Sequence, residues 1–66
     1  MEIMMGRHAM QQARERGITI NEISKVINQG AKHLQEGNKI ISDFMHIRVV
    51  YKRLENKIFV ITVMIR

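Results

Sequence analysis

Apolar positions recur with helical spacing in the first half of the chain. The interval from Arg7 to Arg16 contains good helix formers and a thin apolar stripe, Ala9, Met10 and Ala13. The interval from Ile20 to Gln29 has a stronger stripe, formed by Ile20, Ile23, Val26 and Ile27. The pattern predicts two short helices, the second of which ends at Gly30.

A capping motif predicts a defined corner between these helices. Gly17 can adopt the left-handed conformation that ends a helix. Thr19 can cap the next helix, and Glu22 lies at the N3 position that completes a capping box. Ile18 and Ile23 have the N′ to N4 spacing of a hydrophobic staple. We therefore expect the two helices to meet in a fixed arrangement.

After Gly30 the apolar positions alternate with a period of two, which is typical of β-strands. We expect short strands at residues 32–35 and 39–43 around a turn at residues 36–38, and longer strands at residues 44–52 and 57–65. The two long segments are rich in β-branched residues and close in sequence, which favours an antiparallel hairpin. The predicted fold class is α+β: two N-terminal helices packed on one face of a small antiparallel sheet of three to four strands, with residues 1–66 forming one domain.

The register of the long hairpin decides which side chains share a face. A three-residue loop with Asn56 in the left-handed conformation would place Arg53 opposite Lys57 and Arg48 opposite Thr62. The helices would then cover Ile47, Val49, Tyr51, Phe59, Ile61, Val63 and Ile65. The opposite face would carry His46, Arg48, Lys52 and Thr62.

An alternative register starts from a two-residue turn at Glu55 and Asn56. It would shift the pairing by one residue and place Thr62 opposite Val49. This register buries apolar side chains less consistently, and we rank it second.

The chain carries 11 Lys and Arg against 6 Asp and Glu, a formal net charge of +5. This charge favours polyanionic partners such as RNA, because basic side chains neutralise phosphates and release counterions, although a solvated basic surface is an alternative. A 66-residue chain without cysteine has a small core and no disulfides, so we expect a homo-oligomer. The lack of cysteine, of a signal-peptide pattern and of a membrane-length apolar run favours a cytoplasmic protein without membrane association.

Three polar side chains could together cleave a phosphodiester. His8, in the first helical turn, could move the proton of a ribose hydroxyl. Arg48 offers a planar guanidinium to phosphate oxygens, and Thr62 offers a hydroxyl donor. This chemistry needs no cofactor and no metal, and the three histidines lack the spacing of a zinc site. The alternative is an exposed histidine beside an ordinary cross-strand polar pair.

A second set of cations could position a nucleic-acid backbone, and its members are Arg14, Arg16, Lys52, Arg53 and Lys57. The hairpin-tip members could equally serve to prevent edge-to-edge aggregation.

Six short motifs occur in a fixed order along the chain: Gly6-Arg7-His8-Ala9, Arg14-Glu15-Arg16-Gly17-Ile18-Thr19, Glu22-Ile23, Val26-Ile27-Asn28-Gln29-Gly30, Arg48-Val49-Val50-Tyr51 and Ile61-Thr62-Val63. In this order the chain resembles bacterial domain-of-unknown-function family 4258. The resemblance implies a layout similar to RelE-like and colicin-like ribonuclease toxins, which cleave RNA without metal. It implies His8 as the helix histidine, Arg48 as the strand cation and Thr62 as the final-strand hydroxyl, with Tyr51 as an auxiliary group that the predicted register buries. It also implies a cognate antitoxin or immunity protein as partner.

Two functional hypotheses follow. The first is a toxin-like, RNA-directed protein that acts as a metal-independent endoribonuclease. The second is a noncatalytic homo-oligomeric module that binds nucleic acid or protein. Convergence of His8, Arg48 and Thr62 in one hydrogen-bonded pocket would favour the first hypothesis, and their dispersal over the surface would favour the second.

Overall fold

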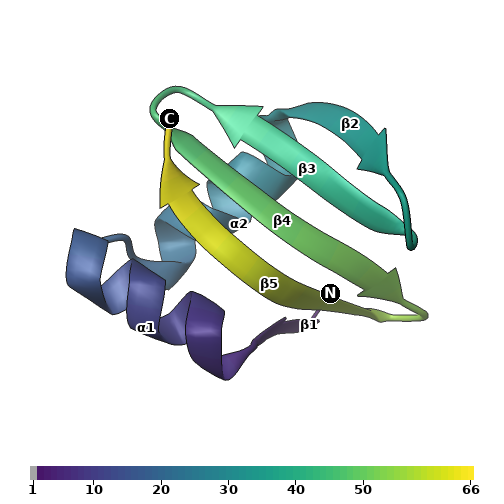
Figure 1. The fold of residues 1–66 in the computed structure, drawn as a ribbon, viewed down its shortest axis with the longest axis horizontal. Coiled ribbons are helices and arrows are strands. Elements are labelled where there is room, and N and C mark those ends of the chain that lie inside the picture. The colour runs from purple at the N-terminus through teal and green to yellow at the C-terminus, as the bar shows by residue number, and fades with distance from the viewer. Residues whose placement is uncertain (1) are drawn as a thin grey trace.

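The computed structural model describes residues 2–66, which contain two helices and five strands (Figure 1). In chain order the elements are β1 (Glu2–Met5), α1 (Arg7–Arg16), α2 (Ile20–Gln29), β2 (Ala31–Gln35), β3 (Lys39–Phe44), β4 (Ile47–Leu54) and β5 (Lys57–Ile65). Neither helix in this part of the chain has the length and apolar composition needed to span a bilayer.

The strands form one mixed sheet in the order β1-β5-β4-β3-β2. β1 pairs with β5 in parallel, and the other neighbours are antiparallel. The predicted antiparallel sheet of three to four strands behind two N-terminal helices is therefore wrong, because a strand precedes the helices and the sheet has five strands. The sequence signal for β1 is weak, since four residues with two methionines show little β-strand periodicity.

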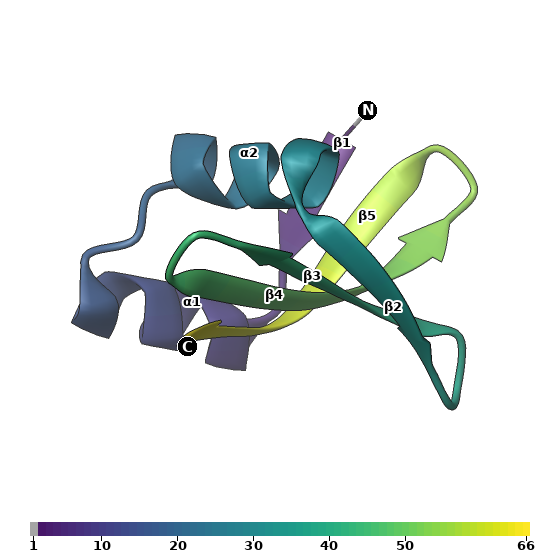
Figure 2. The ribbon, with the colours of Figure 1, turned by 90° about the horizontal axis from the view of Figure 1, so that it is seen from above.

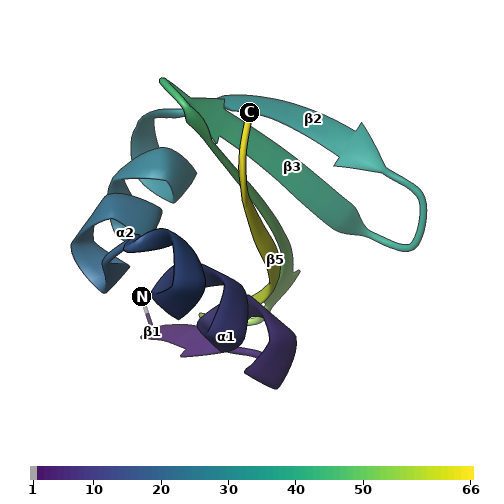
Figure 3. The same ribbon diagram turned by 60° about the vertical axis from the view of Figure 1, so that its left-hand side comes forward.

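Both helices lie on the same side of the sheet (Figure 3). α2 packs against β3 and β4, whereas α1 runs along β5. The elements enclose one apolar core with the buried members Ala9, Ala13, Ile18, Ile23, Val26, Ile27, Ile47, Val49, Tyr51, Ile58, Val60 and Val63. The two buried alanines let α1 approach β5 closely, because they add little bulk at the contact.

The predicted corner between the helices is confirmed. Gly17 has a φ of 66°, and Ile18 N–H donates to the carbonyl of Ala13 at 2.8 Å, as in a Schellman ending. Glu22 N–H donates to Thr19 Oγ1 at 3.1 Å, while Thr19 N–H donates to Glu22 Oε1 at 2.9 Å. These hydrogen bonds form the capping box. The pKa of Glu22 lies below its ordinary value, mainly because the backbone N–H of Thr19 donates to its carboxylate.

The apolar stripes of the two helices extend beyond what the sheet covers. Met10 and Ile20, both predicted to face inward, are 45% and 53% exposed. The sequence period identified the helices correctly but overestimated the width of their buried faces.

The β4–β5 hairpin has a two-residue turn rather than the predicted three-residue loop. Leu54 lies opposite Lys57, and Glu55, not Asn56, has a positive φ, of 49°. The lower-ranked turn is therefore the observed one.

A β-bulge then corrects the register within the same hairpin. Tyr51 lies opposite Val60, but Val50 lies opposite Thr62, so Ile61 is an extra residue in β5. The bulge reverses the inward and outward alternation of β5. Val60 before it and Val63 after it are both buried, and Thr62 stays on the face away from the helices. Because of the two-residue turn, Phe59, predicted to lie under the helices, lies opposite Lys52 and is on the other face.

The predicted β2–β3 hairpin is confirmed, with Gly37 and Asn38 in its turn at φ values of 76° and 61°. Its tip projects away from the helices (Figure 2). At its other end, Gly30 sits where α2 meets β3. Ser42 Oγ, fully buried, donates a 2.6 Å hydrogen bond to the carbonyl of Val26 and ties the strand to the helix.

Candidate nucleic-acid interface

The sheet surface that faces away from the helices, here named the open face, carries three rows of aligned side chains. Each row crosses β5, β4 and β3 in the observed register. The rows are Phe59, Lys52 and Lys39; Thr62, Val50 and Ile41; and Met64, Arg48 and Asp43. An apolar middle row thus lies between a cationic row and a row that contains an ion pair.

The first row places two lysines against each other. Lys39 and Lys52 are direct cross-strand partners, and both are half-buried, with Phe59 next to Lys52. Like charges directly opposite each other destabilise a sheet. The positive charge is therefore concentrated here despite a cost to folding.

The third row contains a two-point ion pair. Arg48 donates from Nε to Asp43 Oδ1 at 2.7 Å and from Nη2 to Asp43 Oδ2 at 2.9 Å. The Nε of Arg66 lies 3.9 Å from Asp43 Oδ2. Hydrogen bonding from Arg48 is the main reason that the pKa of Asp43 lies below its ordinary value, and the same contact raises the pKa of Arg48. Asp43 thus fixes the guanidinium and neutralises its charge.

Arg48 and Thr62 share the open face, as predicted, but not as direct partners. Arg48 lies opposite Met64 and Thr62 opposite Val50, so the two are diagonal neighbours on adjacent strands. The predicted pairing of Arg48 with Thr62 is therefore wrong, because the two-residue turn and the bulge each shift the register by one residue.

His8 is exposed on α1, and two contacts locate its helix relative to β5. Gly6 N–H donates to the carbonyl of Val60 at 3.0 Å, and Val63 N–H donates to Gln12 Oε1 at 3.1 Å. These contacts place α1 beside residues 60–63 of β5, but α1 lies on the covered side of the sheet and Thr62 on the open face. Within residues 2–66, no hydrogen bond joins His8, Arg48 and Thr62 to one another.

Tyr51, the auxiliary residue implied by the family resemblance, is 1% exposed and lies in the core under the helices. Its burial agrees with the predicted face and separates it from the open face.

The comparison with family models matches residues 5–65 to the family described as Domain of unknown function (DUF4258). The chain belongs to the DUF4258 family. The match runs from the end of β1 to the end of β5, and the family resemblance inferred from the motifs is confirmed. The comparison with curated proteins found no significant match, and neither did the comparison with solved structures. None of the three comparisons supports the similarity to RelE-like or colicin-like toxins.

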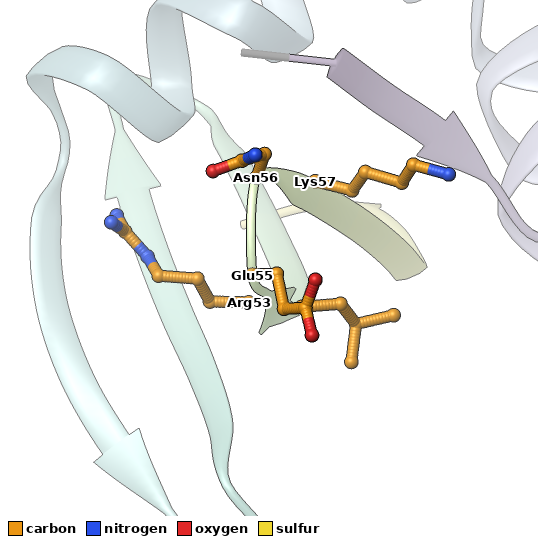
Figure 4. A pocket seen from close by; sticks show the side chains of 5 residues that line it. Arg53, Glu55, Asn56 and Lys57 are labelled. Carbon is orange, nitrogen blue, oxygen red and sulfur yellow. The ribbon is translucent and has the colours of Figure 1, made fainter.

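The cations at the tip of the β4–β5 hairpin in this DUF4258 domain do not form one patch. Residues 53–57 line a shallow hollow of about 510 Å³. Arg53 and Lys57 extend to opposite sides of it, with Glu55 between them (Figure 4). Arg14 and Arg16 are exposed on α1. Of the predicted backbone-positioning residues, Lys52 and Lys57 belong to strand positions that face away from the helices.

Sequence reasoning missed Lys39 as a member of the cationic row. Its partnership with Lys52 follows from a two-residue turn at Met45 and His46, where Met45 has a φ of 55°. Neither turn residue is a glycine or an asparagine, so the usual sequence signal for such a turn is missing. Among the residues described for this DUF4258 domain, no three His, Asp or Glu side chains gather as a metal site.

Proposed function

We propose that this DUF4258 domain binds single-stranded RNA through the open face of its sheet. The observation that supports the proposal most strongly is the pairing of Lys39 with Lys52 as direct partners on neighbouring strands. An RNA backbone would neutralise both ammonium groups and remove the repulsion that the free protein tolerates. The formal net charge of +5 would also attract RNA over a longer range.

The neighbouring side chains indicate how the bases would be accommodated. Phe59 lies in the same row as the lysines, and Val50 and Ile41 form the apolar row beside them. Unstacked bases of a single strand can contact such a surface, whereas a duplex hides them. One aromatic ring provides little base discrimination, so we expect phosphate contacts to dominate and sequence preference to be small.

The test is a salt titration of binding to a fluorescent single-stranded RNA, followed by anisotropy. The test variant combines Lys39→Gln with Lys52→Gln. The matched control combines Lys25→Gln on α2 with Lys32→Gln on β2, which removes the same amount of charge from other positions.

Each phosphate contact contributes about 0.7 to the slope of log K against log salt concentration for single strands. The open-face variant should therefore lose about 1.4 from that slope, and the control variant should lose much less. Equal losses in the two variants would show that binding depends on total charge, and would refute an interface on the open face.

A second candidate function is metal-independent cleavage of the bound RNA, and the observation that favours it is the attachment of α1, the helix that carries His8, to residues 60–63 of β5. His8 would take the proton of a ribose 2′-hydroxyl as that oxygen attacks the adjacent phosphorus. The bond from phosphorus to the 5′-oxygen would break, and that oxygen would take back the proton from His8 through water, leaving a 2′,3′-cyclic phosphate and a 5′-hydroxyl. Thr62 would stabilise the charge on the phosphate oxygens, and Arg48 would do so once the phosphate competes with Asp43 for its guanidinium.

Cleavage is tested separately from binding, with the same RNA in the presence of a chelator. The wild type should release a product that ends in a cyclic phosphate, and His8→Gln should not. A substrate with 2′-deoxyribose should bind and remain intact. Intact RNA under conditions that saturate binding would eliminate the enzymatic candidate and leave the binding proposal standing.

Homo-oligomerisation, an antitoxin or immunity protein as partner, and a cytoplasmic location stay predictions.

A further inference from the structure

An apolar groove lies between α1 and the beginning of α2, outside the RNA interface proposed above. The groove has a volume of about 340 Å³, and its lining includes Met5, Met10, Ile18 and Ile20, with Arg14 and Thr19 at polar positions. Its residues come from the end of β1, from α1 and from the corner between the helices. We refer to it as the α1–α2 groove.

The residues that flank the groove are unusually apolar for a surface. Met10 and Ile20 occupy positions with the spacing of core residues, yet they are 45% and 53% exposed. Clustered exposed apolar side chains mark interaction surfaces more often than scattered ones do. Met5 and Met10 are also flexible and polarizable, and can adjust to a side chain that enters between them.

The charge around the groove is positive. Arg7 and Arg14 lie three residues before and four residues after Met10, so all three share one side of α1. At the N-terminal end of α2, Glu22 accepts from Thr19 N–H and balances the positive end of the helix dipole, so the positive charge beside the groove comes from Arg7 and Arg14. Among the lining side chains in the described structure, none is acidic.

We propose that the α1–α2 groove binds an amphipathic helical segment of an acidic protein partner. A large apolar side chain of that segment enters between Met5, Met10, Ile18 and Ile20, and flanking carboxylates pair with Arg14 and Arg7. The apolar lining disfavours RNA as the occupant, because bases and phosphates would lose hydration there without hydrogen-bond partners. The net charge of +5 disfavours a second copy of the chain, which would bring equal charge to the contact.

The experiment uses the intact protein, labelled with ¹⁵N, and two synthetic helical peptides. One peptide combines leucines spaced three and four residues apart with glutamates on its other face, and its counterpart has lysines in place of the glutamates. The acidic peptide should cause saturable amide shifts at Met5, Met10, Ile18 and Ile20, and the basic peptide should not. Equal binding of both peptides, or shifts located on the open face, would overturn the proposal.

Two charge reversals of equal size provide the matched comparison. Arg14→Glu should weaken binding of the acidic peptide by roughly tenfold, since it replaces an attractive charge at the groove with a repulsive one. Lys25→Glu, at an exposed position of α2 that does not line the groove, should change the affinity much less. Similar losses of affinity in both variants would show that the peptide is attracted by the total charge of the protein, and would contradict specific binding in the groove.

A third variant separates the apolar contribution. Met10→Gln keeps the length and the net charge of the side chain but places a polar group in the groove. It should weaken binding of the acidic peptide. The thermal unfolding midpoint should stay nearly unchanged, because Met10 is 45% exposed and lies outside the buried core. Retention of full affinity would show that the apolar lining is not used.

Discussion

Replacing Gly30 by alanine should destabilise the fold strongly, and the reason is crowding. Gly30 has a φ of −75°, which any residue can adopt. A Cβ at this position would lie 2.5 Å from the carbonyl oxygen of Val26 and 2.8 Å from that of Asp43, and would also collide with Ser42 Oγ. The first two obstacles are backbone atoms that no rotamer change can move.

The expected magnitude follows from these contacts. Overpacking of a tight site costs about 1–3 kcal/mol. Displacing Ser42 would also weaken its buried hydrogen bond to Val26, which is worth about 0.5–1.5 kcal/mol. The sum, about 1.5–4.5 kcal/mol, is a large part of the roughly 3–10 kcal/mol expected for a domain of this length.

The assay is thermal and urea unfolding, followed by circular dichroism. Each kcal/mol should lower Tm by about 4–8 °C in a domain of this size. Gly37 provides the control, because it has a φ of 76° and open space around its Cα. Gly37→Ala should cost only about 1 kcal/mol, and Gly37→Asn less, since asparagine tolerates the left-handed conformation.

At Gly30 the order should reverse, with asparagine worse than alanine because it is larger. An unfolding midpoint for Gly30→Ala within error of the wild type would refute the close approach of α2 to β3.

Three further outcomes follow from the sheet. Lys39→Gln should raise the free energy of unfolding by about 0.2–1 kcal/mol, because it removes the repulsion from Lys52; urea denaturation measures this, and a loss of stability would contradict their pairing. Gln12→Ala should lower stability by about 0.5–1.5 kcal/mol and speed amide exchange at Val63, whose N–H loses its acceptor; unchanged exchange would disprove that contact. Asp43 has a pKa below its ordinary 3.8, so its ion pair stabilises the fold fully above that pH, and this contribution disappears as the pH falls through the lowered pKa. Urea midpoints measured from neutral to acidic pH should therefore fall less steeply for Asp43→Asn than for the wild type, and parallel curves would argue against the linkage.

The elements that the sequence predicts well are those specified by neighbouring residues. Gly17 and Thr19 lie within a few positions of the groups that they cap, so the helical corner is readable as a local motif. β1 has no such local signal, because its parallel partner β5 is more than fifty residues away along the chain. Pairing between distant segments depends on the whole fold rather than on the strand's own composition.

The sequence predicts which face of the sheet carries the candidate site, but not which side chains lie opposite one another on it. Alternation along β4 correctly placed Arg48 away from the core. The bulge at Ile61 was not predictable, because β5 is apolar at nearly every position and fits the core in either register. Lys39 lies opposite Lys52 because β3 and β4 are joined by a turn at Met45 and His46, which lacks the usual turn residues and could not be recognised from the sequence. The side chains that share the open face therefore became clear only with the strand pairing.

The extra residue at Ile61 divides β5 into two halves with different registers against β4. The half next to the turn is aligned by the two-residue turn at Glu55 and Asn56, whereas the far half is also held by α1, whose Gln12 accepts from Val63 N–H. Residues added between Glu55 and Asn56 would lie in the exposed turn, so Leu54 can still pair with Lys57 and the buried Ile58 and Val60 can keep their register. The tip is accordingly the segment where protein engineers can lengthen or exchange the loop, for example to attach a fluorophore, without repacking the interior.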